Sequence, residues 1–260
     1  MLGAIIGDIC GSIYERKPFK TGFPDEVPLT NAESCFTDDS VLTVATAEAI
    51  LTQQDYATVY KKWGRRYPNA GYGGNFYHWV MQDSNEPYNS WGNGSAMRVG
   101  PVGWVYETLE KTLAEAKRSA EVTHDHPEGI KGAQSVAAAI FMARNGASKQ
   151  EIKQYIETTF GYNLNVATQD IWPVYYFEVS CQGSVPESII SFLESHNYEH
   201  AVKIAISLGG DSDTMACIAG AIAEAFYRKI PQDLIDYARQ KLTKEMLSVI
   251  DSFFDLVQYK

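Results

Sequence analysis

The chain has 260 residues, of which 45% are hydrophobic and 21% are charged, and its formal net charge is −10. Such values are ordinary for a soluble globular protein with length enough for a large core, so we expect a single domain over residues 1–260. The acidic balance argues against general attraction to nucleic acid or anionic lipid, and no stretch is apolar for long enough to span a bilayer.

The N-terminal and cysteine patterns indicate a cytoplasmic protein. The first residues lack the basic region and cleavage motif of a secretion signal. The four cysteines show no paired spacing, which makes a zinc site or a disulfide framework improbable. Cys10 and Cys217 lie among small apolar residues and are predicted to be buried, reduced thiols.

Apolar residues recur with helical spacing along most of the chain, and the alternation typical of strands is nearly absent. The segment 174–179 is the best strand candidate, but it has no obvious partner. We therefore predict an all-α fold, a compact bundle of many medium-length helices. The predicted helical stretches are 41–51, 56–63, 76–81, 97–109, 130–143, 152–160, 189–193, 201–208, 215–227 and 234–256.

The first predicted helix carries two patterns. Gly3, Gly7 and Gly11 recur every four residues, so one face lacks side chains and can pack tightly against a neighbour. Another face carries Asp8, and an isolated buried carboxylate is unfavourable. Asp8 therefore either contacts amides and hydroxyls within the fold or supports a metal ligand. Glu15, just past the body of this helix, is the better catalytic candidate.

Two acidic clusters open predicted apolar helices at opposite ends of the chain. They are Thr37–Ser40 and Gly209–Thr214, and each holds two carboxylates and a threonine hydroxyl. Helix capping and surface solvation could explain one cluster, but two exceed what capping requires. Four converging carboxylates would be costly unless cations neutralised them. Because hard oxygen ligands suit Mg²⁺, Mn²⁺ or Ca²⁺ better than zinc, the pattern indicates a metal site of that kind.

A glycine-bearing turn over Trp91–Arg98 leads into another predicted helix. Free amides in such a turn, together with a helix N-terminus, can bind phosphate or pyrophosphate. The Gly-Lys-Ser/Thr sequence of a P-loop is absent. Tyr88 and Trp91 add aromatic faces that could stack on a nucleobase. A tight turn without a ligand is the plain alternative.

The histidines His124 and His126 lie between two predicted helices. This spacing could ligate a transition metal, but no third nitrogen or sulfur ligand is near in sequence. We therefore expect one histidine to donate to a phosphate or ribose oxygen and the other to be structural.

Taken in order, these stretches resemble the ADP-ribosylglycohydrolase family. The order and the paired acidic motifs are specific, whereas a single glycine turn is not. The matching stretches are Gly7–Ser12 with Glu15, Phe36–Asp39, Gly92–Arg98, Thr123–Gly129 and Ser207–Thr214.

The resemblance implies an all-α fold with two Mg²⁺ ions, or Mn²⁺, in a central cleft. Its implied metal ligands are Thr37, Asp38, Asp39, Asp211, Asp213 and Thr214. Its implied substrate-binding residues are Trp91, Gly92, Asn93, Gly94, Ser95, Met97, His124, Gly209 and Gly210. Catalysis is assigned to Glu15, Asp38, Asp39 and Asp213. Which carboxylate acts as the general base stays open, although Glu15 aligns with a glutamate important in the subfamily that cleaves serine-linked ADP-ribose.

The implied reaction is metal-dependent hydrolysis of the N- or O-glycosidic bond between ADP-ribose and an acceptor, which releases ADP-ribose. The acceptor could be an arginine or serine side chain, a nucleobase or a small O-acyl conjugate; nucleic acid enters only as an ADP-ribosylated substrate. Loops at 71–75, 88–91 and 172–183 are expected to choose among them. Two alternatives stay open, a catalytically silent protein that binds ADP-ribose or a partner, and a two-metal phosphoesterase.

Overall fold

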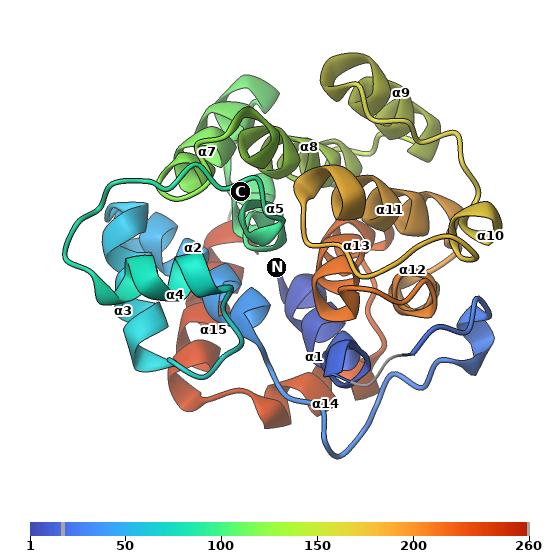
Figure 1. The fold of residues 1–260 in the computed structure, drawn as a ribbon, viewed down its shortest axis with the longest axis horizontal. Helices are drawn as coiled ribbons and strands as arrows, with labels where there is room; N and C mark the ends of the chain where they lie inside the picture. The colour runs from blue at the N-terminus through green and yellow to red at the C-terminus, as the bar shows by residue number, and fades with distance from the viewer. Residues whose placement is uncertain (17–18, 259–260) are drawn as a thin grey trace.

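The computed structural model describes residues 1–16 and 19–258, and this part of the chain is built from helices without a β-strand (Figure 1). The predicted all-α fold is therefore confirmed. Segment 174–179 is irregular, and an isolated antiparallel bridge joins Gly92 to Ser180. None of the described helices is both long and apolar enough to cross a lipid bilayer.

Most of the described helices follow one another with short connections, and longer irregular segments join η1 to α2, α4 to α5 and α10 to α11. The first half of the chain comprises α1 (Leu2–Arg16), the 3-10 turn η1 (Pro24–Glu26), α2 (Asp38–Thr52), α3 (Tyr56–Arg66), α4 (Gly74–Met81), α5 (Gly94–Met97), α6 (Gly100–Val105), α7 (Leu109–Glu121) and α8 (Pro127–Arg144). The second half comprises α9 (Lys149–Phe160), α10 (Thr168–Ile171), α11 (Cys181–Glu194), α12 (Tyr198–Ser207), α13 (Ser212–Tyr227), α14 (Gln232–Lys241) and α15 (Lys244–Gln258).

Helices α1 and α13 form the most closely packed pair, near the middle of the molecule (Figure 1). The glycine face of α1 makes this possible, because Gly3 lies against Gly220 and Gly7 lies against the Ala216 carbonyl. Gly11 meets the main chain at the start of α13 in the same way. The predicted tight packing of these glycines is confirmed. It places the first helix of the chain against α13, a helix far along the sequence.

Replacing Gly7 by alanine should destabilise the fold. Its Cβ would overlap the Ala216 main chain, which cannot yield as a flexible side chain does. Overpacking of this kind costs about 1–3 kcal/mol or more, and urea unfolding followed by circular dichroism would measure it. Gly100→Ala is the matched control, because its Cβ would meet only the methyl groups of Ala4 and Ala221, at 3.9 Å. Equal stability of the two variants would contradict this account of the α1–α13 contact.

Two predicted helices were too long. The stretch 97–109 is interrupted, because α6 starts afresh at Gly100 with Pro101 in its first turn and Thr108 caps α7. The stretch 234–256 divides into α14 and α15 at Thr243, whose hydroxyl accepts from the Met246 amide at 3.3 Å. Helix α9 starts with a capping box formed by Ser148 and Glu151.

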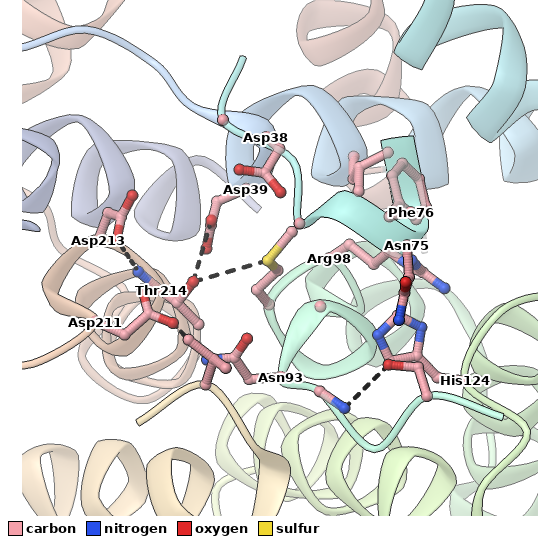
Figure 2. Close-up of a pocket in the computed structure, with 18 of the residues that line it drawn as sticks. Asp38, Asp39, Asn75, Phe76, Asn93, Arg98, His124, Asp211, Asp213 and Thr214 are labelled. Atoms are coloured by element: carbon pink, nitrogen blue, oxygen red, sulfur yellow. Dashed lines mark hydrogen bonds between the residues drawn. The ribbon is translucent and has the colours of Figure 1, made fainter. Parts of the chain in front are cut away.

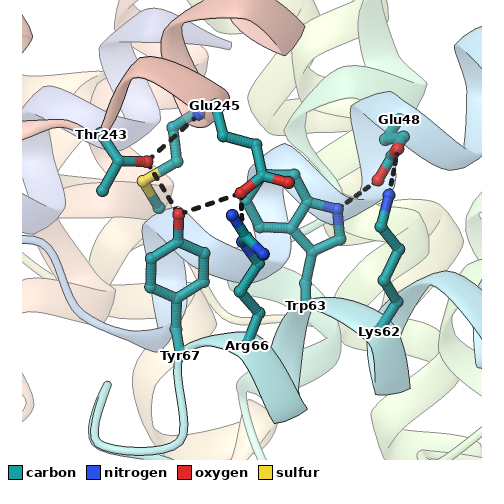
Figure 3. A network of polar contacts seen from close by, with 8 residues as sticks. Glu48, Lys62, Trp63, Arg66, Tyr67, Thr243 and Glu245 are labelled. Carbon is teal, nitrogen blue, oxygen red and sulfur yellow. Dashed lines mark hydrogen bonds and ion pairs between the residues drawn. The ribbon is translucent and has the colours of Figure 1, made fainter.

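Polar contacts with α3 hold helix α2 near its C-terminal end (Figure 3). Glu48 of α2 accepts from the Trp63 indole of α3 and pairs with Lys62 at 2.6 Å. Arg66, at the end of α3, pairs with Glu245 of α15. The hydroxyl of Tyr67, which follows α3, lies 2.8 Å from that of Thr243, just before α15. These contacts hold the helix whose N-terminus carries Asp38 and Asp39.

Candidate active site

The two acidic helix starts meet in the structure. The Thr214 hydroxyl of α13 donates to Asp39 Oδ2 of α2 at 3.2 Å. Asp8, Asp39 and Asp213 each offer an oxygen within 4.8 Å of the others, and Glu15, Asp211 and Asp213 form a second such triad. Because Asp213 belongs to both triads, it lies at the centre of the cluster.

Local sequence explains how each helix start presents its carboxylates. Thr37 caps α2 by accepting from the Asp39 amide at 3.3 Å, and the Asp38 amide donates to the Ala70 carbonyl at 2.8 Å. On the other side, Gly209 and Gly210 both have φ of +78°, a left-handed conformation that glycine adopts without strain. This turn allows the chain to leave α12 and begin α13 beside α1.

Asp8 is fully buried and accepts several hydrogen bonds. The Thr37 amide and hydroxyl donate to it at 3.0 and 2.7 Å, and the Ser40 amide donates at 3.1 Å. The Ser40 hydroxyl donates as well. Asp8 therefore makes the amide and hydroxyl contacts that were one of its two predicted roles. It also fixes the direction of the Thr37 hydroxyl hydrogen.

The cluster carries more negative charge than its surroundings neutralise. Within residues 1–16 and 19–258, no Lys or Arg side chain forms an ion pair with any aspartate of the cluster. Burial and then the neighbouring carboxylates raise the pKa values of Asp38, Asp39 and Asp213 well above 3.8. Asp39 Oδ1 is buried without a hydrogen-bond partner. An oxygen-lined, electron-rich site of this kind suits a hard divalent cation.

The raised pKa values predict how the metal-free protein responds to pH. A carboxyl group whose pKa is higher in the folded than in the unfolded protein stabilises the fold most at low pH. This contribution is lost as the pH rises from near 4, the unfolded pKa, through the folded pKa. The melting temperature in EDTA should therefore fall as pH rises above about 4, less steeply in Asp39→Asn than in the wild type, and Mg²⁺ should offset the fall in the wild type. Thermal melts across this range measure both effects, and parallel pH profiles of the two proteins would contradict the assignment.

The aspartates lie at one end of a cleft of about 420 Å³. Figure 2 shows Asp38, Asp39, Asp211 and Asp213 at this end and Asn75, Phe76, Arg98 and His124 at the other. Asn93 of the glycine turn contacts the acidic end, because its side-chain amide donates to Asp211 Oδ2 at 2.7 Å. The remaining lining residues are Glu15, Leu42, Gly71, Gly73, Gly74, Tyr88, Ser90, Gly92, Gly94, Met97, Phe177, Val179 and Thr214.

The end of the cleft opposite the aspartates contains a buried cation. Arg98 has no exposed surface, and its guanidinium lies 4.3 Å from the centre of the Tyr60 ring. Its Nε and Nη1 atoms have no hydrogen-bond partner. Burial and the Arg98 charge lower the pKa of His124 well below 6.5, so its imidazole is neutral near neutral pH. The cleft is thus acidic at one end and carries a positive charge at the other.

Most of the predicted site residues line this cleft. The exceptions are Thr37, Trp91, Ser95, Gly209 and Gly210. Trp91 is 54% exposed and meets the His126 ring edge-on, and Ser95 is buried with its hydroxyl donating to the Gly129 carbonyl at 2.7 Å. Direct substrate contact by Trp91, Ser95 and the two glycines stays a prediction, as does metal ligation by Thr37.

Comparison with known proteins gives a consistent result. The family model described as ADP-ribosylglycohydrolase matches residues 1–260. The chain is 26% identical over 313 residues to ADP-ribosylhydrolase ARH3 of Gallus gallus, covering 87% of this chain and 84% of that protein. It is 25% identical over 256 residues to ADP-ribosylarginine hydrolase Tri1 of Pseudomonas putida (strain GB-1), covering 87% and 69%. A solved structure described as an ADP-ribosylglycohydrolase-related protein complex shares the fold, with a TM-score of 0.73, 22% identity and coverage of 98% and 97% of the two chains.

Proposed function

Because the chain belongs to the ADP-ribosylglycohydrolase family and is an enzyme of that glycohydrolase type, we propose that it uses divalent cations to hydrolyse the bond between ribose C1″ and an acceptor. The product is free ADP-ribose. The observation that carries the proposal is the charge arrangement of the cleft, with clustered carboxylates at one end and a buried guanidinium beside a glycine turn at the other. ADP-ribose matches it, since the molecule has a polyhydroxyl sugar at one end and a diphosphate in the middle.

The residues of the acidic end fit Mg²⁺ or Mn²⁺. The two carboxylate triads share Asp213, and the buried Asp39 Oδ1 has no other partner. Asp38, Asp39, Asp211 and Asp213 would hold two ions, with the hydroxyls of Thr37 and Thr214 as neutral ligands. Bound there, such ions lower the pKa of water and orient the distal ribose hydroxyls.

Glu15 is the preferred general base. It lies at the end of α1, lines the cleft, and offers an oxygen within 4.8 Å of Asp211 and Asp213. It is exposed at this rim, unlike the buried aspartates, so it can take a proton from water and release it to solvent. Asp39 and Asp213 are engaged with their neighbours and are better suited to holding cations.

The glycine turn and its aromatic neighbours would bind the nucleotide part. Gly92, Asn93 and Gly94 line the cleft between the two ends, where main-chain amides can donate to a diphosphate. Trp91 stands beside this turn with an exposed ring that is free to stack on adenine. Its edge contact with His126 limits how far the ring can turn.

The acceptor is expected to contact the irregular segment between α10 and α11. Phe177 and Val179 of this segment line the cleft, yet their side chains are 55% and 49% exposed. An apolar rim of this kind can pack against the carbon atoms of an acceptor side chain. The name of Tri1 specifies an arginine linkage, so arginine must be tested beside serine and O-acyl acceptors.

Incubation with a panel of ADP-ribose conjugates tests the proposal. The panel contains arginine-linked, serine-linked and O-acyl ADP-ribose, each with Mg²⁺ or with EDTA, and products are identified by mass spectrometry. We expect ADP-ribose with an intact pyrophosphate from at least one conjugate, and only when Mg²⁺ or Mn²⁺ is present. Glu15→Gln should retain binding and lose turnover. Release of AMP would support the phosphoesterase instead, and binding without any turnover would support the silent protein.

A further inference from the structure

Behind the glycine turn, three polar side chains form a buried chain of hydrogen bonds. Arg98 Nη2 donates to Thr123 Oγ1 at 2.8 Å and to the Ser119 carbonyl at 3.0 Å. Thr123 Oγ1 lies 2.7 Å from His124 Nδ1. All three side chains are at most 4% exposed, so no bulk water competes for these bonds.

The contacts of this chain favour one position for the hydrogen of the imidazole ring. A guanidinium only donates, so Thr123 Oγ1 must accept from Arg98. The Tyr88 hydroxyl is a second neighbour of Thr123 and can either accept its hydrogen or donate to it. A hydroxyl that accepts from a buried cation is polarised and becomes a better donor itself. The Arg98 cation bound to the same hydroxyl also favours a lone pair over an N–H at the ring nitrogen that faces it. The Thr123 hydrogen then points to His124 Nδ1, and the neutral ring carries its hydrogen on Nε2.

His124 Nε2 lies against the glycine turn. A Cβ placed on Gly94 would be 3.1 Å from this nitrogen, and one placed on Gly92 would be 3.6 Å away. Gly92, Gly94 and His124 all line the cleft (Figure 2 labels His124). The absence of side chains at these glycines therefore keeps Nε2 open to a ligand.

We propose that Arg98 and Thr123 are positioning residues that hold His124 as the Nε2–H tautomer, a neutral hydrogen-bond donor to an anionic oxygen of the bound substrate. The assignment of that oxygen to a diphosphate rests on the proposed function. The tautomer itself does not, because the buried chain sets it before any ligand binds. Arg98 thus acts on the ligand through two residues while its own guanidinium stays stacked on Tyr60.

Nitrogen NMR of the ¹⁵N-histidine-labelled protein tests the proposal without substrate. The His124 signals are identified by their loss in His124→Gln, which separates them from those of the other four histidines. We expect Nε2 with the chemical shift of a protonated nitrogen and Nδ1 with that of an unprotonated one. Thr123→Ser should preserve this pattern, because it keeps the hydroxyl. Thr123→Val should move the two shifts toward each other and weaken ADP-ribose binding by about tenfold, the loss of one well-placed hydrogen bond.

Different results would contradict the tautomer, the role of Thr123 and the proposed function. Wild-type His124 with its hydrogen on Nδ1 would overturn the proposal even if Thr123→Val failed to fold. Unchanged shifts in a folded Thr123→Val would overturn the role of Thr123. A protein with the expected tautomer that hydrolyses no ADP-ribose conjugate would count against the proposed function and leave the positioning of His124 intact.

Discussion

Replacing Asp213 by asparagine should lower turnover by about a thousandfold or more and remove the stabilisation that Mg²⁺ confers. Asp213 is the member common to both carboxylate triads, so its loss affects both candidate cation positions. A ligand at a hundredfold excess over its Kd stabilises a fold by about 2.7 kcal/mol, and this increment should disappear. In EDTA the variant should melt at a higher temperature than the wild type, because a buried like charge has been removed.

Asp233→Asn is the matched control, since Asp233 lies on α14 and is exposed. Initial rates on the conjugate that the panel identifies, together with melts in Mg²⁺ and in EDTA, complete the measurement. An Asp213→Asn protein that retains both wild-type turnover and the Mg²⁺-dependent rise in melting temperature would exclude the proposed metal centre.

Replacing Gly94 by alanine should raise the KM or the ADP-ribose Kd by about 10–100-fold with a smaller change in kcat. The added Cβ would lie 3.1 Å from His124 Nε2 and 3.3 Å from its Cε1, in the space where a ligand oxygen is expected. Losing a hydrogen bond to a charged group costs about 1.5–3 kcal/mol, which corresponds to this range. Because the carboxylates at the far end of the cleft are untouched, chemistry on bound substrate should be largely preserved.

Calorimetric titration with ADP-ribose and steady-state kinetics separate binding from turnover here. Gly100→Ala again serves as the control, because Gly100 lies outside the residues that line the cleft. Wild-type affinity in Gly94→Ala would mean that the substrate does not use the space beside His124.

The acidic end of the site could be predicted from sequence because its signals are local. Thr37 caps α2 and the two glycines before α13 adopt the left-handed conformation, so a few consecutive residues specify each helix start. The glycine repeat in α1 also predicted the tight contact that brings these starts together, although it could not identify α13 as the partner. Pairing of segments 175 residues apart depends on side-chain packing throughout the core, which periodicity does not record.

At the opposite end of the cleft the sequence identified the glycine turn and His124, but not the parts played by Arg98 and Thr123. Arg98 stood at the end of a recognised motif, but a lone arginine after a helix is ordinarily a surface residue, and its burial depends on the rings of Tyr60 and Phe76. The role of Thr123 was equally hidden, since a threonine beside a histidine carries no distinctive pattern. Segment 172–183 was expected to help choose the acceptor, but the structure is needed to show that Phe177 and Val179 are the residues that reach the cleft.

Binding of Mn²⁺ to the metal-stripped protein, followed by electron paramagnetic resonance, tests the account most directly. Mn²⁺ replaces Mg²⁺ at oxygen-rich sites and reports its own surroundings. The account predicts two Mn²⁺ ions per chain, close enough for their spins to couple, as in two-metal sites with ions about 3.5–4 Å apart, and a spectrum that changes when ADP-ribose is added. A protein that binds no Mn²⁺, or that hydrolyses its substrate at the full rate with none bound, would contradict it.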